Sequence, residues 1–142
     1  MPLENFGSIL NFAEELERQD QEFYATLTAN PACGAYKEMF EQLAAAANKN
    51  MKNVQRIRRE NVTEMILEPI KGFTRAPYCE ECASADTLST EDALATARRL
   101  EDRAVRYYTE AAEKIKALPE VSRSLNAIGK KHMGHRDRLA AL

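Results

Sequence analysis

The chain has 142 residues, of which 44% are hydrophobic and 30% are charged, and its formal net charge is −2 at pH 7. This composition is ordinary for a soluble globular protein, and the length suits one domain over residues 1–142. Both signs of charge are interspersed along the sequence. The balance excludes the strongly basic composition of many nucleic-acid-binding or membrane-surface proteins, so we expect neither partner.

We expect neither a membrane span nor a secretory signal in this sequence. No apolar run approaches the roughly 18 residues that a membrane span needs. The first five residues lack the basic start and apolar stretch of a secretory signal, so we expect a cytoplasmic protein. The three cysteines, an odd number, do not indicate a secreted disulfide framework.

The first half of the chain predicts two helices. Apolar residues recur at helical spacing over residues 8–29, and Asn30-Pro31 ends this segment. A second helix is expected over residues 35–61, where side chains spaced alternately by three and four share one face. That face consists of Tyr36, Phe40, Leu43, Ala47, Asn50, Val54 and Ile57.

Residues 62–88 have a different character, with Pro69, Gly72 and Pro77 and no sustained period. We interpret them as one long crossover with a short turn of helix over residues 63–67. A connection this long is uncommon inside a compact domain. A four-helix bundle whose middle connection runs the length of the bundle accounts for it.

Two more helices are predicted in the second half. The third begins at Ser89 or Thr90, where Ser89 and Asp92 resemble a capping box, and continues to residue 116. The fourth runs from residue 119 or 120 to the end. Its inward stripe consists of Val121, Leu125, Ile128, His132, His135, Leu139 and Leu142. The fold class is therefore expected to be all-α, with four helices.

The two halves of the chain echo one another. Glu17 precedes Tyr24 by seven residues in the first helix, and Glu101 precedes Tyr108 by seven in the third. Residues seven apart lie nearly in line on a helix, so each Glu shares a face with its Tyr. The echo predicts a pseudo-symmetric bundle.

Several polar side chains are expected to face the core. A buried carboxylate is costly unless it meets a metal, a cation or hydrogen-bond donors. Polar residues in or beside the apolar stripes therefore deserve a chemical explanation. The six that project inward are Glu17, Asp20, Asn50, Glu101, His132 and His135.

The four helices, the crossover and the Glu-x6-Tyr pattern resemble the ferritin-like superfamily, most closely rubrerythrin-type di-iron domains, over nearly the whole chain. In that family each half gives one Glu from its first helix and a Glu-x-x-His pair from its second. The resemblance implies a ferritin-like four-helix bundle with the long crossover between helices two and three. It also implies metal-dependent oxidoreductase or iron-handling chemistry.

Only three of the six ligands that the resemblance implies are present. Glu17 and Glu101 match the first-helix Glu of each half. The two Glu-x-x-His positions instead begin with Ala47 and Gly129, which offer no ligand atom, and only His132 remains of them. Both bridging carboxylates are missing, which argues against a standard di-iron centre.

One interpretation of the remaining residues is a single metal ion. Two carboxylates and an imidazole, from Glu17, Glu101 and His132, suit iron, manganese or zinc. His135, one turn after His132, and Asp20 are weaker candidates for the same ion. The chain would then be a metal-dependent oxidoreductase or iron-handling protein with an altered, mononuclear site.

The other interpretation, which we favour, is a polar core without a metal. Glu101 would hydrogen-bond to His132, Glu17 would pair with Asn50, and both tyrosines of the Glu-x6-Tyr pattern would contribute. The chain would then be a non-catalytic binding or structural module. We expect a homodimer, because ferritin-like domains commonly pair through helix faces.

Outside the core, two features suggest further roles. Cys79 and Cys82 form a lone Cys-x-x-Cys in the crossover. They could be a thiol-redox pair, half of a zinc site shared between subunits, or packing residues of a loop, and the first two readings would make the chain a redox or zinc-linked regulator. Cys33 is expected to be inert. A basic run over residues 49–59 is interpreted as a solvated face or a partner surface.

Overall fold

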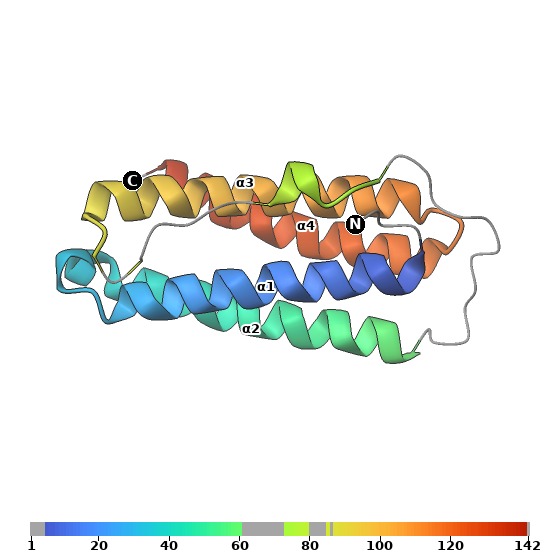
Figure 1. Ribbon diagram of the computed structural model, residues 1–142, viewed down its shortest axis with the longest axis horizontal. Helices are drawn as coiled ribbons and strands as arrows, with labels where there is room; N and C mark the ends of the chain where they lie inside the picture. Colours follow the sequence, from blue (N-terminus) through green and yellow to red (C-terminus); the bar gives the residue numbers. More distant parts are fainter. Residues whose placement is uncertain (1–4, 61–72, 80–84, 86, 142) are drawn as a thin grey trace.

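The computed structural model describes residues 5–60, 73–79, 85 and 87–141. Its four long helices are α1 (Phe6–Thr28), α2 (Lys37–Glu60), α3 (Thr90–Lys114) and α4 (Pro119–Ala140). Helix α1 packs chiefly against α2, and α3 packs chiefly against α4, and the two pairs form one bundle (Figure 1). The predicted all-α bundle, with its long connection between the second and third helices, is confirmed.

The helix ends follow from local capping chemistry. The side chain of Asn5 accepts a hydrogen bond from the Ser8 backbone at 2.8 Å, so α1 begins two residues earlier than predicted. The segment Pro31–Tyr36 forms a 3-10 helix, η1, and delays the start of α2 by two residues. Ser89 caps α3 by accepting from the Asp92 backbone at 3.2 Å.

The described residues 73–79 of the connection between α2 and α3 lie on the side of the bundle formed by α1 and α3 (Figure 1). They include the short 3-10 helix η2, Ala76–Tyr78. Phe73 stacks on Tyr107 of α3 with ring centroids 5.5 Å apart, and Arg75 pairs with Glu15 of α1 at 3.6 Å. The opposite side, formed by α2 and α4, carries none of the described crossover residues.

Two expectations concern segments beyond the four helices. The turn of helix predicted over residues 63–67 lies outside the described residues. None of the described helices combines the length and the apolar composition that a membrane crossing requires.

The apolar core consists of two clusters with a polar layer between them. The first cluster includes Ile9, Phe12, Tyr107, Ile115 and Leu125. The second includes Leu27, Phe40, Leu43, Leu94 and Leu100. The polar layer, where the four helices pass from one cluster to the other, consists of Glu17, Asp20, Asn50, Glu101, Arg103 and His132, each at most 2% exposed.

Candidate functional site

His132 lies at the centre of the polar layer, between two carboxylates. Its Nδ1 is 2.5 Å from Glu101 Oε2, and its Nε2 is 2.8 Å from Glu17 Oε2. The imidazole ring stacks on Tyr108 at 5.6 Å between centroids. An imidazole can donate from both nitrogens only when it is protonated, so two ionised carboxylates at its two nitrogens favour an imidazolium.

The charges around His132 favour that protonated form. Burial opposes it, but the charges of Glu17 and Glu101 and their hydrogen bonds raise the pKa of His132 well above its ordinary 6.5. Burial likewise works against the ionised form of Glu101. The charge of His132, its hydrogen bond to Glu101 and the nearby His135 overcome this effect and lower the pKa of Glu101 to about 2. The three residues form a buried carboxylate–imidazolium–carboxylate triad.

Two tyrosines complete the triad in a reciprocal pattern. The hydroxyl of Tyr24 donates to Glu101 Oε1 at 3.1 Å, and the hydroxyl of Tyr108 donates to Glu17 Oε2 at 2.7 Å. Each tyrosine therefore donates a hydrogen bond to the Glu of the other half of the chain. Burial and the adjacent carboxylates raise the pKa of both phenols, which keeps them protonated as donors.

Asn50 occupies the position in α2 that corresponds to His132 in α4. Its amide Nδ2 donates to Glu17 Oε1 at 3.4 Å and lies 3.4 Å from His132 Nε2. An amide supplies hydrogen-bonding capacity without charge. The second half of the chain thus contributes the cation of the triad, and the first half contributes a neutral partner.

Arg103, which the sequence reasoning missed, brings a second cation into the polar layer. Its Nη2 donates to Asp20 Oδ1 at 2.7 Å, and its Nη1 donates to Gln19 Oε1 at 2.8 Å. Burial raises the pKa of Asp20, and the guanidinium opposes that rise. One sequence signal was present: Gln19 and Arg103 each stand two residues after the Glu of the echo, so long polar side chains occupy equivalent positions.

His135 lies at the edge of the site, not inside it. Its side chain is 22% exposed, and its Nδ1 lies 3.5 Å from Glu101 Oε1. That nitrogen has no hydrogen-bond partner among the described residues. The structure thus places His135 beside Glu101, whereas Asp20 lies beside Arg103.

The two described cysteines, Cys33 and Cys79, lie apart from the polar layer. Cys79 is an exposed free thiol whose Sγ contacts the Arg75 carbonyl at 3.4 Å. Cys82, its predicted partner, lies outside the described residues. Cys33 is buried in η1, and burial raises the pKa of its thiol, in keeping with an unreactive side chain.

The residues of the site do not fit a two-metal centre. Ala47 is buried at the first position where the resemblance implies a bridging carboxylate, and it has no ligand atom. At the second, Gly129 has no side chain, and a Cβ there would lie 3.2 Å from the Tyr108 Cβ, so a larger residue would require Tyr108 to shift by a few tenths of an ångström. Glu17 and Glu101 alone offer too few carboxylate oxygens to bridge two ions and balance their charge.

Two smaller groups have donors close enough for one ion, with all ligand atoms within 4.8 Å of one another. In the first, Glu17, Asp20 and His132, the carboxylate of Asp20 is already bound by Arg103. In the second, Glu101, His132 and His135, the nitrogen of His135 has no hydrogen-bond partner among the described residues. The second group is the better fit for a single ion.

Comparison with known proteins agrees with the architecture. The model of the ferritin-like domain family matches residues 7–142, which includes the four helices and the polar layer. No curated protein and no solved structure matches the chain.

Proposed function

The chain belongs to the ferritin-like domain family, and we propose that it is a rubrerythrin-type member that has lost di-iron catalysis. In this proposal, cationic side chains of the protein neutralise the buried carboxylates in place of metal ions. The domain then acts as a binding or structural module. The observation that carries the proposal is the position of His132, whose two nitrogens meet the two surviving carboxylates.

Charge compensation explains how such a core can be stable. A buried carboxylate without a partner is strongly destabilising, and metal ions supply the partner in di-iron proteins. Here the His132 imidazolium forms ion pairs with Glu17 and Glu101, while the Arg103 guanidinium forms an ion pair with Asp20. Hydrogen bonds from both tyrosines occupy further carboxylate lone pairs. The polar layer then has a structural role.

Metal content tests this proposal. The purified, tag-free chain is loaded anaerobically with iron(II), manganese(II) or zinc(II), desalted, and analysed by inductively coupled plasma mass spectrometry. We expect well under one equivalent of each metal at the core, and no change in His132→Ala. About one equivalent per chain that disappears in His132→Ala would contradict the proposal.

A second candidate function is metal-dependent redox or iron handling at a mononuclear site. The nitrogen of His135, without a hydrogen-bond partner among the described residues and 3.5 Å from Glu101, supports it. Glu101, His132 and His135 would hold the ion, which would supply Lewis-acid or redox chemistry. This candidate predicts that His135→Ala removes the metal as completely as His132→Ala does.

A further inference from the structure

Although both signs of charge are interspersed along the sequence, basic residues predominate on α2 and α4 and acidic residues on α1 and α3. Helices α2 and α4 together carry eleven Lys and Arg residues against five Asp and Glu. Helices α1 and α3 carry six against eleven. Because α2 lies beside α4, and the described crossover lies on the α1 and α3 side, the basic helices form a face of the bundle that no described crossover residue covers (Figure 1).

The cations at the centre of this face are regularly spaced. Residues 49, 52, 56 and 59 are separated by three, four and three positions, so their side chains share one side of α2. This row spans about 15 Å of helix. Lys131 of α4 joins it, and all five side chains are exposed.

Most of these cations have no acidic contact among the described residues. On α1 and α3, Arg18 pairs with Glu14 at 3.3 Å and Arg106 pairs with Asp102 at 3.2 Å, each one turn away. In the row on α2, only Arg56 has an acidic contact among the described residues, with Glu60 at 4.0 Å. Like charges one turn apart repel, so the face favours binding of an anion.

The row lines a concave surface. A hollow of about 430 Å³ lies between α2 and α4, within the size range of small-ligand sites. None of the described residues that line it is acidic, and the uncharged one, Asn53, offers a side-chain amide. The lining residues are Lys49, Lys52, Asn53, Arg56, Arg59 and Lys131.

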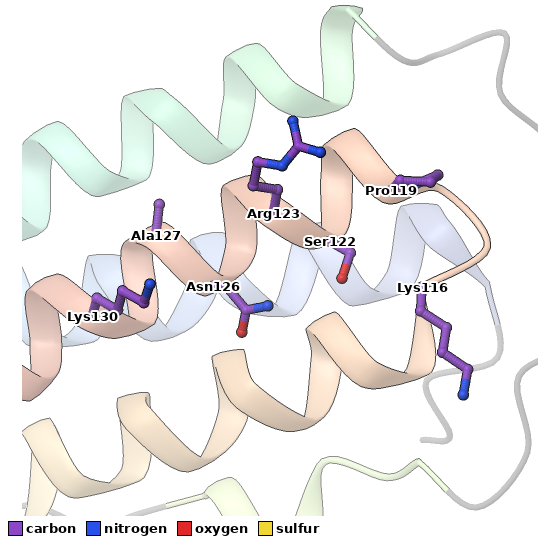
Figure 2. A pocket seen from close by; sticks show the side chains of 7 residues that line it. All are labelled: Lys116, Pro119, Ser122, Arg123, Asn126, Ala127 and Lys130. Carbon is purple, nitrogen blue, oxygen red and sulfur yellow. The ribbon is translucent and has the colours of Figure 1, made fainter.

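A second hollow on α4 provides an internal comparison. It has a similar volume, about 470 Å³, and Figure 2 shows Arg123 extending from α4 toward α2 while Ser122 lies on the side facing α3. Of its three cations, Lys116 already pairs with Glu113 at 3.0 Å. Only Arg123 and Lys130 have no acidic partner among the described residues.

We propose that the hollow between α2 and α4 binds a small soluble anion that carries two or three linked phosphate groups. Arg guanidinium groups bind phosphate oxygens in pairs, and Lys ammonium groups act as point charges for them. Five cations from two helices line one small concavity, and they match the charge density of linked phosphates better than that of a single carboxylate. The hollow does not use the polar layer, so this proposal stands apart from the proposed function.

The test is calorimetric titration of the full chain with inorganic tripolyphosphate over a range of salt concentrations. We expect saturable binding of one equivalent that weakens as salt increases. Lys52→Gln/Arg56→Gln should weaken binding by tenfold or more. The matched control Arg123→Gln/Lys130→Gln, which removes the same charge from the second hollow, should weaken it by less than threefold.

Three outcomes would overturn the proposal. Equal weakening in both double variants would indicate general charge screening. Absence of saturable binding at physiological salt would show that the hollow is not a binding site for linked phosphates. Binding of a single-stranded oligonucleotide or of vesicles with phosphoinositide headgroups, without binding of tripolyphosphate, would assign the face to a macromolecule or a membrane. If Lys52→Gln/Arg56→Gln misfolds by circular dichroism, Lys49→Gln/Lys131→Gln provides the same measurement.

Discussion

Replacing His132 by Phe removes the cation of the triad while keeping an aromatic ring beside Tyr108. Glu17 and Glu101 would then remain buried, and each would lose the cation that lies within hydrogen-bond distance of it in the native chain. Removing one partner of a buried ion pair costs about 3–5 kcal/mol, because the remaining charge is uncompensated. We expect a loss of this size in the free energy of unfolding, measured by urea denaturation with far-UV circular dichroism.

Two companion variants separate charge from packing. His135→Phe makes the same chemical change one turn away at a partly exposed position, and it should cost less than about 1 kcal/mol. Adding Glu17→Gln and Glu101→Gln to His132→Phe should restore part of the loss, because the buried charges are then gone. A cost for His132→Phe no larger than that for His135→Phe would refute the triad.

Three further predictions use the same unfolding assay. Tyr24→Phe and Tyr108→Phe should each cost about 1–3 kcal/mol, because each removes a hydrogen bond to a buried carboxylate, and a neutral result for either would break the reciprocal pattern. The pKa of Glu101 is lowered from 4.5 to about 2, so stability should fall by about 3 kcal/mol as pH drops from about 4.5 to 2, and Glu101→Gln should lose that dependence. Gly134→Ala should stabilise α4 by about 1 kcal/mol, whereas Gly129→Ala should gain less because its Cβ meets Tyr108, and equal gains would contradict that packing.

The architecture could be predicted because its signals are local and periodic. Helical spacing of apolar residues predicts four helices, and Asn30-Pro31 and Ser89 mark ends that the structure also has. The seven-residue spacing from Glu17 to Tyr24 predicts a shared face, since seven residues complete nearly two turns. The predicted start of α1 is two residues too late, because its N-cap, Asn5, precedes the apolar stripe.

The pairing of side chains across the core could not be predicted from spacing alone. Periodicity places Tyr24 and Glu101 on inward faces, but the relative height of α1 and α3 decides that Tyr24 reaches Glu101. Arg103 stands just outside the apolar stripe, and only its long side chain allows its guanidinium to enter the core and reach Asp20. A sequence pattern predicts which face of a helix a residue occupies, but it does not predict which partner a long side chain reaches.

The basic face likewise depends on the way in which the helices assemble. The sequence distributes both signs of charge, and the net charge of −2 gives no indication of a basic surface. The face appears only because α2 lies beside α4, while the crossover residues 73–79 lie on α1 and α3. Net charge constrains the whole molecule, whereas binding depends on the local arrangement of charges.

The protonation state of His132 tests the central claim most directly. In ¹⁵N-edited NMR spectra of the labelled chain, an imidazolium and a neutral imidazole have distinct ring-nitrogen shifts. We expect both His132 nitrogens to carry protons at neutral pH and to lose one only well above the ordinary pKa of 6.5. A neutral ring at neutral pH, or ring-nitrogen shifts that change on addition of one equivalent of zinc, would show that an imidazolium does not neutralise the buried carboxylates.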